Sequence, residues 1–111
     1  MSLRYEAPSE ISKAEFLRAI EAGVVSVVCQ AIVSAVHYIE DYGWLVDQFT
    51  LLLDHSDESV RGVTATCVGH LARLHSNSDR AQLLLLLERR LSDPLIVGQV
   101  EDAIDDVNMY G

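Results

Sequence analysis

The chain has few of the residues that mark disordered, disulfide-rich or nucleic-acid-binding proteins. Its 111 residues include only two Pro and two Cys, and 8 Lys and Arg stand against 17 Asp and Glu, which gives a formal net charge of −9. Because half of the residues are hydrophobic, we expect a single folded domain over residues 1–111. The shortage of basic residues opposes binding to nucleic acid phosphates and favours a basic protein partner.

Signals for export or membrane insertion are also missing from the sequence. Cys29 and Cys67 lie outside any CxxC spacing, and the start "MSLRYEAPSEIS" has neither the basic nor the apolar region of a signal peptide. The apolar run within residues 23–41 is shorter than the about 20 residues that a membrane span needs, and Ser26, Gln30 and His37 interrupt it. We therefore expect a cytoplasmic protein with reduced thiols and no membrane association.

That run, "GVVSVVCQAIVSAVHYIED", predicts a helix although its many β-branched residues are typical of strands. Its apolar residues follow steps of three and four over four turns, whereas a strand would alternate with a period of two. The positions are 24, 25, 28, 31, 32, 35, 36 and 39.

The same helical pattern returns twice, each time after 36 residues. Five columns of apolar or small residues align, and at about 100° per residue they fall within one stripe about 100° wide, as a core-facing helix requires. The columns are Val24, Val60 and Ile96; Val28, Thr64 and Val100; Ala31, Cys67 and Ala103; Ile32, Val68 and Ile104; and Ala35, Leu71 and Val107.

Another apolar helical segment precedes each of these three helices, so the sequence predicts six helices in three hairpins. The hairpins are expected at residues 12–41, 43–76 and 79–110, within a residue or two. Start signals support these limits. The expected capping boxes are Ser12 with Glu15 and Asp79 with Gln82, and the expected N-caps are Asp57 and Asp93, the latter followed by Pro94.

Residues 57–71, "DESVRGVTATCVGHL", resemble the second helix of a HEAT repeat, which has an acidic turn, Val-Arg, small residues and then a triplet ending in Gly. The matching residues are Asp57, Val60, Arg61, Ala65, Cys67, Val68 and Gly69. The outer repeats depart from this pattern: Val25 and Val97 replace the arginine, and Val33 and Asp105 replace the glycine.

The resemblance implies an all-α fold, a right-handed α-solenoid of three HEAT-like helical hairpins. It also implies a non-enzymatic protein-binding module without a cofactor. Some very small bacterial HEAT-like proteins look like immunity proteins that neutralise a cognate toxin, often a basic nuclease. An acidic inhibitor of a basic toxin is therefore the most specific hypothesis.

In HEAT-like stacks the second helices line the concave face, so the columns beside the core stripe are candidate binding positions. They are mostly polar and become acidic in the last helix, where Glu101, Asp102, Asp105 and Asp106 could attract Lys or Arg side chains of a partner. The alternative is that these acids only keep the last helix soluble. The candidates on this face are Thr66, His70, Arg73, Asp102, Asp105 and Asp106.

A second candidate surface is the segment around "EDYGW", with Glu40, Asp41, Tyr42 and Trp44, because aromatic residues often anchor interfaces. The alternative is that Tyr38 and Trp44 pack the joint between the first two repeats.

Two groups of apolar residues exceed what the core stripe needs. We expect Val25, Val27 and Val33 to be buried, with the segment that carries Leu3, Tyr5 and Ile11 folded over the first helix. Leu85 and Leu86 are expected to point away from their hairpin, which would offer a surface for a homo-oligomer unless they are buried. The alternative for the three valines is likewise a surface for self-association or for a partner.

An enzyme, or an accessory subunit of one, is the competing class, with a site formed by His37, Glu40 and Asp41 beside the aromatic residues of 37–44. A metal is not expected, since His70 and His75 lie on different helix faces and only one His/Glu pair has helical spacing. A generic adaptor or self-associating scaffold is a further alternative.

Overall fold

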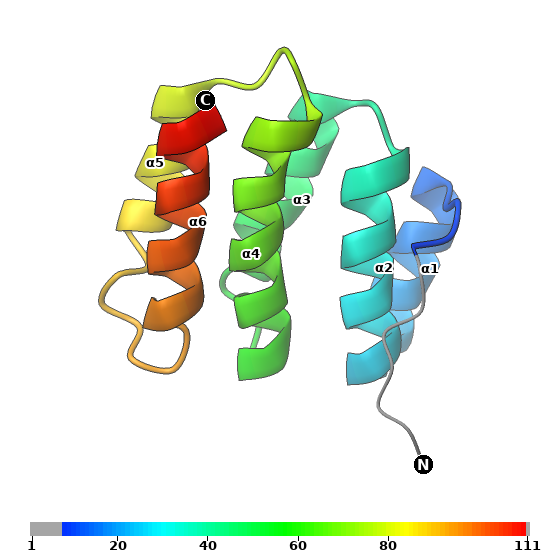
Figure 1. Cartoon of the computed structure of the whole chain (residues 1–111). Helices are drawn as coiled ribbons and strands as arrows, with labels where there is room; N and C mark the ends of the chain where they lie inside the picture. The colour runs from blue at the N-terminus through cyan, green and yellow to red at the C-terminus, as the bar shows by residue number, and fades with distance from the viewer. Residues whose placement is uncertain (1–7, 111) are drawn as a thin grey trace.

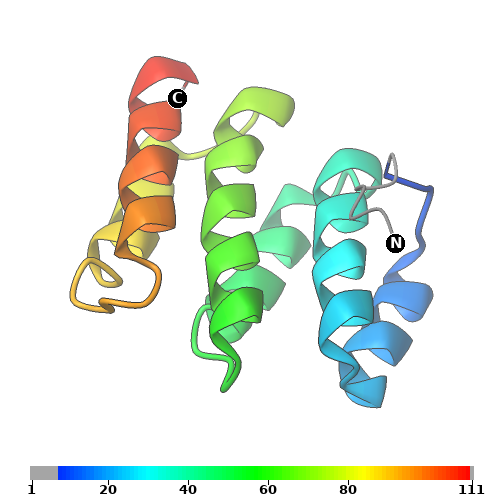
Figure 2. The same ribbon diagram turned by 60° about the horizontal axis from the view of Figure 1, so that its bottom comes forward.

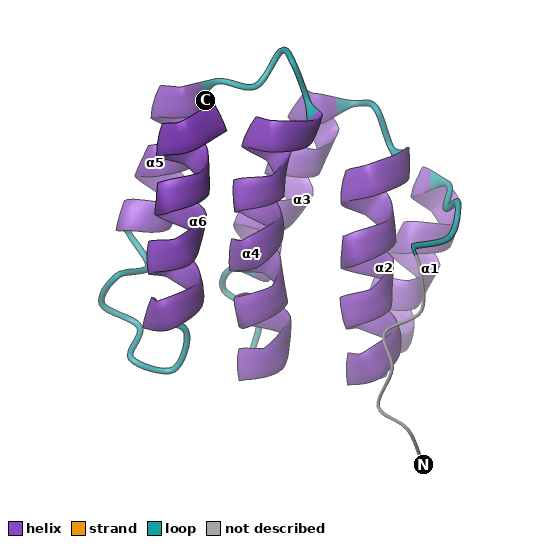
Figure 3. Ribbon diagram, in the orientation of Figure 1, coloured by secondary structure: helices purple, strands orange, loops and turns teal. Residues whose placement is uncertain are grey.

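The computed structural model describes residues 8–110, which form six α-helices and contain no strand (Figure 3). The predicted all-α class and the six helices are therefore confirmed. In chain order, the helices are α1 (Lys13–Ala22), α2 (Val25–Tyr38), α3 (Tyr42–Leu52), α4 (Glu58–Leu74), α5 (Arg80–Glu88) and α6 (Val97–Tyr110).

The helices are arranged in two rows. Helices α2, α4 and α6 stand side by side in one row, and α1, α3 and α5 lie behind them (Figures 1 and 2). Helix α4 packs against both α2 and α6, while α1, α3 and α5 each pack against the helix that follows in the chain. We call α2, α4 and α6 the B row and the other three helices the A row. Three successive hairpins therefore build the stack.

The core lies between the two rows and follows the predicted stripe. The residues of the predicted stripe that are buried are Val28, Ala31, Ile32, Ala35, Val60, Thr64, Cys67, Val68, Leu71, Ile96, Val100, Ala103 and Val107. Ile104 is only partly buried against the core. From the A row, Phe16, Leu45, Val46, Phe49, Leu52, Leu83 and Leu87 are buried in the same core.

The prediction that Val24 belongs to the stripe was wrong, because Val24 is 54% exposed. Gly23 ends α1 with a φ of 74°, and Val24 is already the extended N-cap residue of α2. The turn is so short that Val24 precedes the first helical residue, and its side chain is not held on the helix face.

Most predicted helix starts are confirmed, with two corrections. Ser12 and Glu15 form the full capping box, and Asp57 caps α4 by accepting from Ser59 and Val60. Asp79 caps α5, but the Gln82 side chain accepts a hydrogen bond from Tyr42 instead of completing a box. The other correction concerns Asp93, which accepts from the backbone N–H of Leu95 in a turn, so that α6 begins at Val97, three residues after Pro94.

The apolar surplus is distributed differently from the prediction. Val25 and Val27 are exposed, so their predicted burial was wrong, whereas Val33 packs partly against the core. Leu86 also packs partly against the core and does not point away, while Leu85 is 52% exposed. Ile11 packs against the core beside α1, and the other two residues of the proposed cover, Leu3 and Tyr5, lie outside the described residues.

Ionic and polar contacts join the hairpins. Arg61 in α4 donates through Nε to Asp93 in the turn before α6 at 3.0 Å, and its Nη1 donates to the carbonyls of His55 and Ser56. Tyr42 at the start of α3 donates to Gln82 and accepts from the backbone N–H of Asp79. The second and third hairpins are therefore fixed to each other at both ends. Among residues 8–110, no helix is long and apolar enough to cross a membrane.

Candidate partner-binding surface

The face of the B row carries a groove that runs along α4 between α2 and α6. Its volume is about 430 Å³. Val33 from α2 and Val63 and Cys67 from α4 supply apolar walls, and Thr66 and His70 are the predicted binding residues that line it. The remaining lining residues are Ser59, Gly62 and Gln99.

Two glycines bring α6 close to α4 and thereby set one edge of this groove. A Cβ atom on Gly69 would lie 3.0 Å from the Ala103 Cα and 3.2 Å from an Asp106 carboxylate oxygen. A Cβ atom on Gly62 would lie 3.1 Å from the Gln99 amide nitrogen. Gln99 and Asp106 therefore both lie on the α4-facing side of α6, and Asp102 lies between them one helical turn from each.

Residues from all three B-row helices surround His70, which lines the groove. The His37 and His70 rings lie 6.3 Å apart, and Arg73 Nη2 donates to His70 Nδ1 over 3.3 Å. Because a guanidinium can only donate, the neutral His70 ring carries its proton on Nε2. Burial lowers the pKa of His70, and the charge of Arg73 lowers it further, while Asp106 opposes both. His70 is therefore neutral at pH 7.

The carboxylates of α6 divide between two sides of the helix. Asp106 is half-buried against α4, whereas Glu101, Asp102 and Asp105 are exposed. At about 100° per residue, Asp105 lies about 100° from Asp106, on the outer flank of the helix. None of the four forms an ion pair with another residue of the described range. Their charge is thus available to a partner.

The predicted residues of the α2–α3 segment have contacts within the protein. Asp41 pairs with Lys13 at 2.6 Å and caps α3 by accepting from Trp44 N. The Trp44 ring packs edge-on against Phe16 at 5.3 Å, with the Lys13 Nζ 5.3 Å from its centre. These contacts give Asp41 and Trp44 a structural role that does not depend on binding a partner.

The other residues of this segment differ in exposure. Glu40 is exposed, and Tyr42 bridges to the third hairpin through its hydroxyl group. Tyr38 is 46% exposed, so of the two aromatic residues predicted to pack the joint between repeats only Trp44 does so.

The residues of the competing enzyme hypothesis have similar internal partners. His37 Nδ1 lies 2.9 Å from the Val33 carbonyl, and Asp41 is held by Lys13. Within residues 8–110, no three His, Cys, Asp or Glu side chains are grouped as metal ligands. Burial raises the pKa of the Cys67 thiol to about 12, and burial also raises the pKa of Cys29. Both thiols are therefore protonated at pH 7, which makes them weak nucleophiles.

Sequence reasoning missed the groove residues Val63 and Gln99. They occupy equivalent positions, because both are members of the 36-residue column that also contains Val27. At about 100° per residue, this column lies between the core stripe and the polar columns, on the same side of the helix. The change in this column from Val27 and Val63 to the polar Gln99 was the sequence signal that could have pointed to these groove residues.

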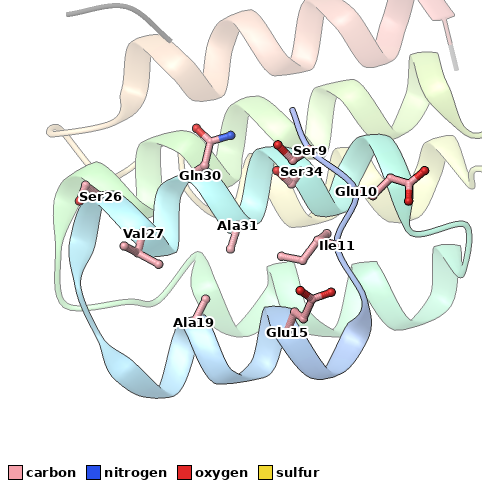
Figure 4. A pocket seen from close by; sticks show the side chains of 10 residues that line it. All are labelled: Ser9, Glu10, Ile11, Glu15, Ala19, Ser26, Val27, Gln30, Ala31 and Ser34. Carbon is pink, nitrogen blue, oxygen red and sulfur yellow. The ribbon is translucent and has the colours of Figure 1, made fainter. Parts of the chain in front are cut away.

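A second hollow, of about 330 Å³, lies in the first hairpin between residues 9–11, α1 and α2 (Figure 4). Ile11, Ala19, Val27 and Ala31 give it an apolar floor. The Glu15 carboxylate at its edge is already used in the capping box with Ser12. The remaining lining residues are Ser9, Glu10, Ser26, Gln30 and Ser34.

Comparison with known proteins identifies a structural relative. A chain in the crystal structure of a CDI complex from Cupriavidus taiwanensis LMG 19424 has a TM-score of 0.90 and 27% sequence identity, over 98% of both chains. No protein-family model matches this chain, and no curated protein matches it. The fold is thus that of a small α-helical protein known from a complex, and the HEAT-like assignment stays a prediction.

Proposed function

We propose that this protein is an immunity protein, which neutralises a toxin by binding it. The observation that carries this proposal is the match over 98% of both chains to a component of a CDI complex. CDI denotes contact-dependent inhibition, in which a toxin is paired with an immunity protein. An immunity protein acts inside the cell that it protects, so a cytoplasmic location belongs to the same proposal.

Surface chemistry supports the inhibitor role over the toxin role. The net charge of −9 suits a protein that binds a basic partner, such as a nuclease whose surface is made to attract phosphates. The unpaired carboxylates of α6 and the groove along α4 lie on neighbouring parts of one face. A rigid stack of hairpins presents such a face without a large rearrangement, which lowers the cost of binding.

The proposed binding residues are those of the B row, Thr66, His70, Arg73, Asp102, Asp105 and Asp106, with Glu40, Asp41, Tyr42 and Trp44 as a secondary set. Of the secondary set, Glu40 is exposed and forms no ion pair or side-chain hydrogen bond within residues 8–110, whereas the other three also hold the fold together.

The test is reconstitution with the cognate toxin, which is sought first in the gene directly upstream of this one. The two proteins should co-elute as a 1:1 complex, and co-expression should restore growth to cells that make the toxin. When this protein is added stepwise to the toxin, toxin activity should reach zero at one molar equivalent, because a binder acts stoichiometrically. Complete neutralisation by a small fraction of an equivalent would instead identify an enzyme, and arrest of growth by this chain alone would identify the toxin.

Self-association is the remaining alternative, and Leu85 is the residue that favours it. Its side chain is 52% exposed on the A row, away from the groove. Light scattering of the isolated protein and of Leu85→Gln separates the cases. A dimer mass that falls to the monomer mass in the variant would support a homo-oligomer.

A further inference from the structure

We propose that the groove along α4 holds one Lys or Arg side chain of the toxin. This inference rests on the proposed function and deepens it, because it names the group that the partner inserts. Four features of the groove support it: its shape, the chemistry of its walls, the charge beside it and the balance of charge at its His70 end.

The shape and walls suit a long side chain with an apolar stem. The groove is central in the B row and its volume of about 430 Å³ is within the range of small-ligand sites. Val33, Val63 and Cys67 give it apolar walls. The methylene groups of Lys and Arg pack well on such surfaces while the charged head stays at a polar edge.

The α6 edge supplies that polar environment. Gln99 lines the groove with an amide oxygen that can accept a hydrogen bond, and Asp106 approaches from the same side of α6. Asp102, between them, is exposed and forms no ion pair with any residue of the described range. A cation that enters beside α6 therefore meets an acceptor and unneutralised carboxylates, which make stronger hydrogen bonds than neutral acceptors.

Charge at the His70 end of the groove fixes the direction of the guest. Arg73 and Asp106 both lie beside His70, so their opposite charges offset each other at that end, whereas Asp102 has no cation beside it to offset its charge. The head is therefore expected near Gln99 and Asp102, with the stem toward Val63. Phosphate groups are disfavoured as guests, because the net charge of −9 repels them.

Small probes test the groove without the toxin. The ¹⁵N-labelled protein is titrated with Nα-acetyl-arginine methylamide and with its citrulline analogue, which has the same shape without the charge. Arginine should shift the amide signals of Val63, Thr66 and Gln99 in a saturable way, and citrulline should shift them several-fold less. Shifts spread evenly over all acidic residues, or equal shifts with both probes, would overturn the proposal.

A matched pair of variants tests the groove in the complex. Gln99→Lys places a cation at the expected position of the guest head, and Ala81→Lys makes the same charge change on α5 in the A row. Gln99→Lys should raise the Kd for the toxin at least tenfold, and Ala81→Lys should change it less than twofold. Melting curves and far-UV circular dichroism establish that both variants are folded.

The outcomes separate the two proposals. If the wild-type protein binds the toxin and both variants bind equally well, the groove assignment is wrong and the immunity function stands. If the wild-type protein does not bind the toxin, the immunity function is wrong, and the arginine titration still decides whether the groove accepts a cation.

Discussion

Gly69 of α4 and Ala103 of α6 meet so closely that a Cβ atom on Gly69 would lie 3.0 Å from the Ala103 Cα. The same atom would lie 3.2 Å from the Ala103 Cβ and 3.2 Å from an Asp106 carboxylate oxygen. Two of these three neighbours belong to the backbone or the first side-chain carbon, which cannot rotate away. The contact therefore sets the spacing of the last two B-row helices, and with it the α6 edge of the groove.

Gly69→Ala should destabilise the protein despite the better helix propensity of Ala. Overpacking typically costs about 1–3 kcal/mol, whereas replacing Gly by Ala in a helix gains at most about 1 kcal/mol. Urea unfolding should show a lower midpoint with an unchanged slope. Gly62→Ala is the matched control, because its closest neighbour is the flexible Gln99 side chain. Its stability should equal or exceed that of the wild type, and equal losses for both variants would contradict this account of the contact.

The Arg61–Asp93 ion pair should contribute much more to stability than the Lys13–Asp41 pair. The side chains of Arg61 and Asp93 are 16% and 22% exposed, against 46% and 51% for Lys13 and Asp41. Arg61→Met should cost about 3 kcal/mol, because it leaves a mostly buried carboxylate and two backbone carbonyls without their donor. Lys13→Met should cost about 1 kcal/mol or less. Urea unfolding measures both losses of stability, and similar losses in the two variants would contradict this difference between the ion pairs.

The core of the fold could be predicted because helical periodicity is a local property. Buried residues recur every three or four positions in each B-row helix, and the 36-residue spacing shows that the three helices have equivalent places. Val24 was misplaced because periodicity does not reveal where a helix begins. The first residue of α2 is set by the left-handed conformation of Gly23 and by the short turn after α1.

The binding surface could be predicted only in part, since it depends on how the helices pack against one another. The polar columns pointed to Thr66 and His70, and both line the groove, while their role in binding stays a prediction. The proximity of Gln99 and Asp106 to α4 follows from Gly62 and Gly69, whose tertiary partners are not encoded in local spacing. The internal partners of Asp41 and Tyr42 lie 28 and 40 residues away, so sequence patterns could not show that these residues were already engaged.

The stability of the protein should fall as the pH drops below about 6.5, and His70 should account for part of that fall. The pKa of His70 is lowered from 6.5 in the folded state, first by burial and then by Arg73. Between the two pKa values the unfolded chain binds the proton and the folded protein does not, so acid favours unfolding. This contribution is fully present above the unfolded-state pKa and is lost as the pH falls toward the folded-state value.

Urea unfolding from about pH 7.5 to about pH 5.5 tests this prediction in the wild type and in His70→Asn. The variant should show a smaller decrease in stability over this range. Glu15 and Asp41, whose pKa values are lowered from 4.5 and 3.8, lose their contributions only at lower pH and do not interfere. Parallel decreases in the two proteins would show that His70 titrates in the folded state as it does in the unfolded chain.

The acidic face of α6 should accelerate the encounter with the toxin. Replacing Asp102, Asp105 and Asp106 together with Asn removes three exposed or half-exposed carboxylates from one helix. Electrostatic steering acts mainly on the association rate, so the triple variant should associate more slowly while its dissociation rate changes less. Stopped-flow mixing at ionic strengths of about 0.01 M and about 0.15 M should show a difference that narrows with salt, because the Debye length shrinks.

A second triple variant distinguishes a directed field from net charge alone. Glu21→Gln, Asp47→Asn and Glu88→Gln remove the same charge from exposed positions of the A row. If only the α6 variant is slow, the toxin approaches along α6, and the carboxylates are part of the binding surface. Equal slowing of both variants would mean that the overall charge attracts the toxin and that the α6 acids serve as a solubilising end of the stack. An unchanged rate in the α6 variant would remove this helix from the binding surface and leave the groove and the α2–α3 segment as the candidates.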